Sequence, residues 1–232
     1  MTREEYVEKV KEIMIKKNPY GRYHQQNFTT YNNLGEMAPI NSAILNDMPS
    51  EKIILSWDAY QHLLAISEVT NETLQEFPFS LYGKETSSNQ IEFNELITSS
   101  KDRQNTSASF NQIMIESLQK KIAENIQNGL VVCHGHSHPP IGSFHENFSL
   151  GDFTSFMEMN EENPVFKNRE VELVGCLVTS SQDINFVFYD NKYQNFYRFT
   201  NVFARDQNNN LIPVNCYGLN QSEQPNNNIT RK

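Results

Sequence analysis

The sequence predicts an α/β fold in which a mixed, curved β-sheet is flanked by helices. Short runs of apolar, β-branched and aromatic residues, typical of strands, alternate along the chain with segments whose apolar residues recur at helical spacing. The chain has 232 residues, of which 38% are hydrophobic, and it contains 15 Phe and 10 Tyr. We therefore expect one sizeable domain with a packed core rather than two full domains.

The N-terminal part of the chain predicts a helix followed by an irregular arm. Residues 2–17 place apolar side chains at helical spacing among charged ones, and Asn18-Pro19 should end this helix. Residues 18–50 are rich in Asn, Gln, Thr, Tyr, Pro and Gly and show no clear period. We interpret residues 1–51 as this helix followed by an irregular arm, residues 18–50, that wraps the main domain or is partly disordered.

The main domain is expected to span residues 52–205. A helix at 57–72, whose first turn Ser56 can cap, and a longer helix at 107–127, which Gly129 would end, should flank the sheet.

The remaining elements of this domain are strands and a further helix. Residues 149–161 predict the helix. After the domain, the Asn-rich tail at 206–232 is expected to be disordered. Strands are predicted at 53–55, 77–82, 91–98, 130–133, 171–178, 184–189 and 196–199.

Charge and cysteine content narrow the class of protein. The formal net charge is −9, which disfavours binding to nucleic acid or to an anionic membrane, because phosphate contacts need clustered Lys and Arg. The three cysteines are widely spaced and odd in number, so we expect no disulfide framework and a reducing compartment. No stretch approaches the roughly 20 apolar residues of a membrane span, and residues 1–17 do not resemble a signal peptide. The default expectation is a cytoplasmic protein, with secretion by a route that needs no cleaved signal left open.

The chemistry is concentrated after the predicted strand at 130–133. His136 and His138 are two residues apart, so in a strand their side chains point to one face, about 6.6 Å apart. Asp152 lies in the first turn of the next predicted helix, and a loop that returns would bring it beside them. Two imidazoles and a carboxylate, with water in the fourth position, are the donor set of a catalytic zinc site.

Such a site needs a base to take a proton from water. Glu76 stands at the start of the predicted strand 77–82, where its carboxylate could act without binding the metal.

These residues belong to a set that resembles a known motif over roughly residues 52–200. The set comprises Glu76, Gly83, His136-Ser137-His138-Pro139 and Ser149-x-x-Asp152. It resembles the JAMM motif of the metallopeptidases that carry an MPN (JAB) domain. The loop at 139–151 is longer than is usual in that family, and Pro78 is unexpected inside the strand after Glu76.

The resemblance implies an MPN-like fold and a zinc-dependent metalloprotease or isopeptidase. It further implies that His136, His138 and Asp152 bind one Zn²⁺, that Glu76 is the general base, and that Ser149 stabilises the oxyanion. Known members of the family cleave isopeptide bonds of ubiquitin chains or process ubiquitin-like and sulfur-carrier proteins. The implied partner is therefore a protein or peptide substrate, and ubiquitin-like proteins are among the substrates that the resemblance suggests.

Other interpretations of the same residues stay open at this point. The chain could be a non-catalytic MPN-fold binding module, since some family members have lost the metal. It could also be a metal-dependent hydrolase of a non-protein amide or of nucleic acid, the latter disfavoured by the acidic charge. Ser149 and Asp152 also form a helix capping pair, and Glu76 could simply be a solvated residue after the preceding helix. His134 shares the strand parity of the other histidines, but as a fourth ligand it would exclude water, so a packing or supporting role is favoured.

The aromatic residues of the enlarged loop suggest a further role. Phe144 and His145 are candidates for a substrate groove or lid, whereas Phe148 is expected to be a hydrophobic staple before the helix.

Overall fold

The computed structural model describes residues 1–17, 40, 45–87, 89–99, 112–141 and 146–216. The helices are α1 (Arg3–Lys17), α3 (Trp57–Thr73), α4 (Gln112–Asn125), α5 (Leu150–Glu162) and the short α6 (Pro164–Lys167). The strands are β1 (Asn46–Leu55), β2 (Pro78–Ser87), β3 (Gln90–Thr98), β4 (Leu130–His138), β5 (Glu172–Thr179), β6 (Ile184–Asp190), β7 (Asn195–Arg205) and β8 (Leu211–Pro213).

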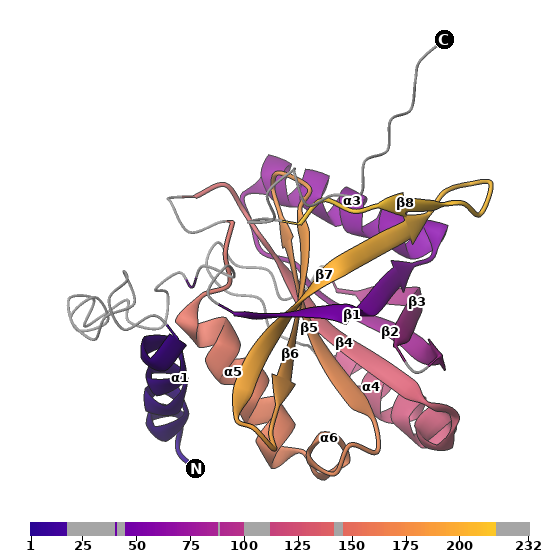
Figure 1. Ribbon diagram of the computed structural model, residues 1–232. Helices are drawn as coiled ribbons and strands as arrows, with labels where there is room; N and C mark the ends of the chain where they lie inside the picture. Colours follow the sequence, from indigo (N-terminus) through magenta and orange to yellow (C-terminus); the bar gives the residue numbers. More distant parts are fainter. Residues whose placement is uncertain (18–39, 41–44, 88, 100–111, 142–145, 217–232) are drawn as a thin grey trace.

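Seven of these strands close into a mixed β-barrel (Figure 1). Around the barrel the order is β1-β3-β2-β4-β5-β6-β7, and β7 pairs with β1 to close the ring. The pairs β1–β3, β4–β5 and β7–β1 are parallel, and the other four are antiparallel. Strand β8 pairs with β7 beyond the point where β6 ends.

The prediction of an MPN-like mixed, curved sheet flanked by helices was wrong, because the sheet closes into a barrel. The closing contact joins Asn46–Met48 to Tyr197–Phe199 and Lys52–Leu55 to Asn201–Ala204. Most of these residues lie outside the short strands predicted at 53–55 and 196–199. With those strands extended to ten and eleven residues, the two ends of the sheet meet.

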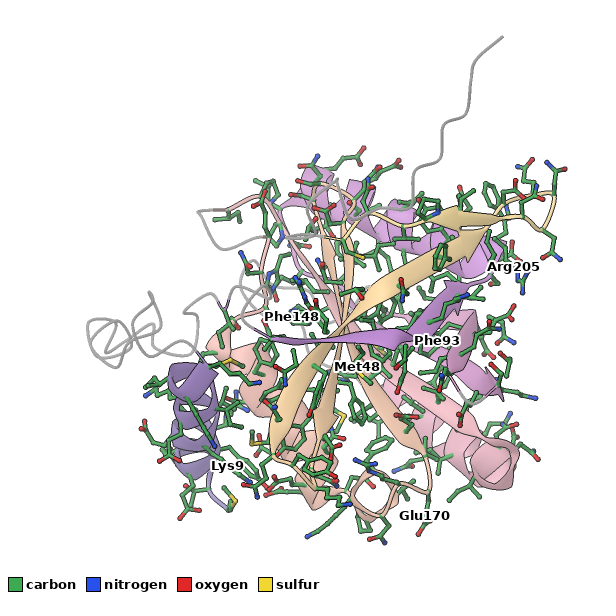
Figure 2. All side chains as sticks on the ribbon, viewed as in Figure 1. Lys9, Met48, Phe93, Phe148, Glu170 and Arg205 are labelled. Atoms are coloured by element: carbon green, nitrogen blue, oxygen red, sulfur yellow. The ribbon has the colours of Figure 1, made fainter. Side chains whose placement is uncertain are left out.

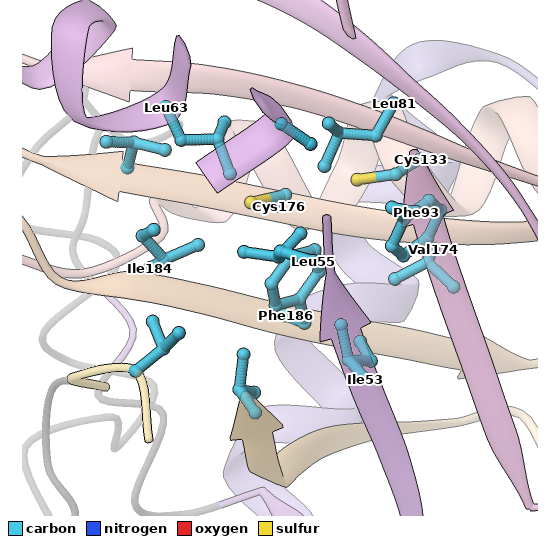
Figure 3. Close-up of a cluster of buried hydrophobic side chains, with 14 of the residues drawn as sticks. Ile53, Leu55, Leu63, Leu81, Phe93, Cys133, Val174, Cys176, Ile184 and Phe186 are labelled. Atoms are coloured by element: carbon cyan, nitrogen blue, oxygen red, sulfur yellow. The ribbon is translucent and has the colours of Figure 1, made fainter. Parts of the chain in front are cut away.

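Alternation along the strands separates two hydrophobic clusters. One fills the barrel, and its members include Leu55, Phe93 and Phe186 (Figure 3). Helix α3 adds Leu63 to this cluster and so closes one end of the barrel. The other cluster packs outside the barrel, between the strands and the helices α1, α4 and α5. In β4, Val131 and Cys133 belong to the first cluster, while Leu130 and Val132 belong to the second.

Described segments near both termini contribute to the body of the protein. Helix α1 lies against α5 (Figure 1), with Tyr6, Val10 and Met14 buried in the outer cluster. Ile40 is fully buried and donates its N–H to the carbonyl of Phe148 at 2.7 Å. The tail was predicted to be disordered from residue 206, but β8 is part of the sheet; residues 217–232 lie outside the described part. The predicted domain boundary at residue 52 stays a prediction, although β1 already begins at Asn46.

Among the described residues, no helix combines the length and the apolar character needed to cross a bilayer.

Candidate metal centre

The histidine pair occupies the C-terminal end of β4. His136 and His138 point to the outer face of the barrel, with ring centroids 4.8 Å apart and their Nε2 atoms 2.9 Å apart. Gly135, between His134 and His136, packs against the ring of Phe79 from the neighbouring strand β2. The strand geometry therefore delivers two ring nitrogens to one point.

Asp152 reaches the same point from the first turn of α5. Ser149 is the N-cap of this helix, and it forms a capping box with Asp152. The carboxylate oxygen Oδ2 accepts the Ser149 N–H at 2.6 Å and the Ser149 hydroxyl at 2.8 Å. The other oxygen, Oδ1, lies 3.2 Å from His136 Nε2. The capping interpretation is therefore confirmed, and the same geometry turns one oxygen of Asp152 toward the histidines.

Local sequence and topology explain why α5 begins at this place. Strands β4 and β5 are parallel neighbours, so the chain must cross over between them, and the crossover helix α5 starts near the end of β4. Phe148 precedes the cap and packs on Phe153 with centroids 5.4 Å apart, as the predicted hydrophobic staple. Its ring, near the start of α5 (Figure 2), also forms an edge-to-face pair with the His136 ring, with centroids 6.5 Å apart.

The three side chains fit a small divalent cation. One donor atom from each of His136, His138 and Asp152 lies within 4.8 Å of the others. A tetrahedral zinc ion with ligands at 2.0–2.1 Å would space those ligand atoms about 3.3 Å apart. His136 Nε2 lies 2.9 Å from His138 Nε2 and 3.2 Å from Asp152 Oδ1, while His138 Nε2 lies 3.6 Å from the other carboxylate oxygen, Oδ2. The side chains keep 15%, 11% and 21% of their surface exposed, which leaves an open side for water or substrate.

Glu76 lies on the same face, just before β2. In the antiparallel pair of β2 and β4, Pro78 lies opposite His136. The next residues, Phe77 and Ser137, also lie opposite each other, because the Ser137 N–H donates to Phe77 O at 3.1 Å. Glu76 is therefore at the level of His138. Pro78 is the first residue of its strand, a position that tolerates proline. Glu76 is only 9% exposed and does not belong to the group of three metal-binding candidates.

The charges of these groups depend on one another. Burial raises the pKa of Glu76 to about 7, an effect that His136 opposes and Asp152 reinforces. Burial disfavours a charged His136, but the carboxylates of Asp152 and Glu76 outweigh it and raise its pKa to about 9. Burial also works against a charged Asp152, yet both histidines and the Ser149 N–H hold its pKa well below the usual range. A cation at this point would take the place of the proton on His136.

The other residues singled out from the sequence are placed differently. His134 is not in the group of three donors, and burial lowers its pKa to about 3, so it favours the neutral form. Cys133 and Cys176 are buried, as expected, inside the barrel. Phe144 and His145 lie outside the described residues, so their proposed contact with substrate stays a prediction.

Sequence reasoning overlooked two hydroxyl groups behind the site. Thr70 and Ser137 are fully buried, and their oxygen atoms are 2.6 Å apart. A signal was available, because Thr70 continues the buried stripe of Leu63 and Ile66 along α3, where an apolar residue would be expected.

Comparison with known proteins adds no identification. No protein-family model matches the chain, and a search of curated proteins found no match.

Proposed function

We propose that this protein is a zinc-dependent hydrolase of peptide or isopeptide bonds. The observation that carries the proposal is the convergence of His136, His138 and Asp152 at spacings that suit zinc. A buried carboxylate, Glu76, shares their face and is not needed as a ligand. The residues also follow the order of the JAMM motif, with a longer loop between His138 and Asp152, and this resemblance supports the same chemistry.

Each residue has a distinct part in this proposal. A zinc ion bound by the three donors would lower the pKa of water and polarise a carbonyl group. Glu76 takes a proton from the attacking water and delivers it to the leaving amine. Ser149 donates its hydroxyl to the oxygen that gains charge, and to do so it releases Asp152 Oδ2, which it holds at 2.8 Å.

The substrate we propose is a protein or peptide, with ubiquitin-like proteins the first to test. The three cysteines are free thiols, which suits the reducing cytoplasm as the place of action.

The metal assignment is tested by zinc content after purification without chelators. We expect about one zinc per chain in the wild type and in Glu76→Gln, and a loss of affinity of more than about 100-fold in the His136→Ala/His138→Ala double variant. Full zinc content in the double variant would refute the site.

The reaction is tested with a panel of substrates. The panel holds ubiquitin dimers joined through lysine side chains, C-terminal peptide fusions of ubiquitin and of a sulfur-carrier protein, and small amides. We expect cleavage that zinc restores after chelation, and a fall in kcat of about 100- to 10,000-fold in Glu76→Gln with zinc retained. Zinc-restored cleavage of the small amides alone would point to a hydrolase of non-protein amides instead.

A further inference from the structure

A buried hydroxyl pair lies on the opposite side of β4 from the metal-binding face. Ser137 stands between His136 and His138, so its side chain points away from them toward α3. Its Oγ accepts the N–H of Phe77 at 2.9 Å and lies 2.6 Å from Oγ1 of Thr70. Because both side chains are fully buried, water does not compete for these bonds.

These bonds close a ring around the turn that carries Glu76. Leu74, which ends α3 in the left-handed conformation at φ 55°, donates its N–H to Thr70 O at 2.9 Å. Three residues later, Phe77 binds Ser137 twice, through its N–H to Oγ and through its carbonyl to the Ser137 N–H at 3.1 Å. The Thr70–Ser137 contact joins the two anchors. Glu76 therefore sits in a short turn that is fixed at both ends.

The ring ties the turn to the strand that carries the metal-binding histidines. A displacement of Phe77 along β4 would move Glu76 relative to His138, since they occupy the same level of the sheet. The strength of a hydrogen bond falls steeply with distance and angle, so a small shift of the Glu76 carboxylate would weaken proton transfer.

We propose that Thr70 and Ser137 are positioning residues, whose joined hydroxyl groups hold Glu76 in register with the histidine pair. The inference rests on the proposed function, because it assigns to Glu76 the task of proton transfer. Neither hydroxyl touches the substrate; they act through the backbone of Phe77.

The chain provides a matched control on the same helix. Ser67, one turn before Thr70, is 1% exposed and donates its hydroxyl to Thr179 O at 2.7 Å. It ties α3 to β5 but has no bond to the turn at 74–77. Ser67→Ala therefore removes a buried hydroxyl bond of α3 without loosening the ring around Glu76.

The test compares Thr70→Val, which keeps the shape and removes the hydroxyl, with Thr70→Ser, which keeps the hydroxyl. In the zinc-loaded protein, we expect Thr70→Val to lower kcat by about 10- to 100-fold on the best substrate of the panel. KM and zinc affinity should stay within about threefold of the wild type. Thr70→Ser and Ser67→Ala should keep wild-type kcat. Should Thr70→Val fail to fold, Ser137→Ala removes the same contact from the other side.

A second readout does not depend on turnover. Loaded with Co²⁺ in place of zinc, the protein absorbs visible light according to the geometry around the metal. We expect Glu76→Gln and Thr70→Val to change this spectrum in the same way, and Ser67→Ala to leave it unchanged. This result supports the positioning role even if no substrate in the panel is cleaved.

The outcomes separate the two proposals. If Glu76→Gln abolishes turnover but Thr70→Val behaves like Ser67→Ala in both readouts, the positioning role is overturned and the hydrolase proposal stands. If Glu76→Gln changes neither turnover nor the Co²⁺ spectrum, Glu76 does not act at the metal, and both the base assignment and the positioning role fall.

Discussion

At the scale of single residues, the candidate site depends on a glycine that is not one of the candidate ligands. A Cβ atom on Gly135 would lie 2.2 Å from Cε2 and 2.4 Å from Cζ of Phe79, whose ring is fully buried in the barrel. The absence of a side chain therefore lets β2 and β4 pack closely at the level where His136 projects. Such close packing fixes the strand that carries both histidines.

Gly135→Ala should destabilise the protein, because the new methyl group must displace the Phe79 ring. We expect a loss of about 1–3 kcal/mol in the free energy of unfolding, measured by chemical denaturation, together with weaker zinc binding. Adding Phe79→Leu should restore part of the stability by making room. If Gly135→Ala is as stable as the wild type, β2 and β4 pack more loosely than the close approach of Gly135 to the Phe79 ring implies.

Leu74→Gly should stabilise the protein slightly. Leu74 adopts φ 55°, which costs an ordinary residue about 1 kcal/mol but costs glycine little, and the leucine side chain is 44% exposed. The greater freedom of glycine in the unfolded chain offsets part of the gain. We expect a net gain of about 0.5 kcal/mol by thermal denaturation with unchanged zinc content. A loss of more than about 1 kcal/mol would show that the side chain packs on the turn before Glu76.

At the scale of elements, α1 is joined to the helix that carries Asp152. Lys9 of α1 pairs with Glu161 of α5 at 2.7 Å, with both side chains less than one-fifth exposed, and the Tyr189 hydroxyl donates to the same carboxylate at 2.7 Å. Arg3 pairs with Glu158 at 2.9 Å. The N-terminal helix therefore braces the outer side of α5 while the capping box fixes its start.

Lys9→Ala should lower stability more than Lys11→Ala. The Lys9 variant leaves the partly buried carboxylate of Glu161 without its cation, at a cost of about 1 kcal/mol and about 2–4 °C in Tm. Lys11 also forms a 2.7 Å pair, but with Glu8 of the same helix, whose side chain is 66% exposed, so its loss should change Tm by less than about 1 °C. Equal effects of the two variants would show that the contact between α1 and α5 is held by apolar packing alone.

At the scale of the whole molecule, the barrel separates two charged regions. The candidate metal-binding residue His138 ends β4, and Glu172 lies beside Val131 near the other end of that strand, about 23 Å from His138 along the strand. Burial raises the pKa of Glu172 to about 7, Glu51 and Glu85 add to this effect, and Arg169 opposes it. The two regions are far enough apart to be varied independently.

Glu172→Gln should change how stability depends on pH. An unfolded chain releases the Glu172 proton near pH 4.5, whereas the folded protein keeps it to about pH 7. Wild-type stability therefore falls as the pH rises from 4.5 to 7, by on the order of 3 kcal/mol from this group, and the variant lacks this fall. The gain of the variant over the wild type should be absent below pH 4.5 and complete above pH 7, measured by denaturant titration. A difference that does not vary with pH would contradict the assignment.

Helix ends could be predicted from the sequence because the residues that cap or end a helix lie within a few positions of it. Ser56 caps α3, Gly129 follows the helical segment in the left-handed conformation, and Phe148 staples α5, all as predicted. Strand ends were less readable. Chain segments such as Asn46–Met48 are mostly polar and lie near a proline. They form part of a strand only because they pair with β7.

The sequence by itself determined the candidate donor set, since alternation in β4 puts His136 and His138 on one face and a capping box puts Asp152 in the first turn of a helix. Only the tertiary structure decided that the sheet closes and that a crossover brings the start of α5 to the end of β4. It also decided that Thr70 meets Ser137 behind the site. The physical reason is that alternation and capping act between residues a few positions apart. Strand pairing and buried hydroxyl contacts join residues up to about 150 positions apart, and no local pattern in the chain encodes which partners meet.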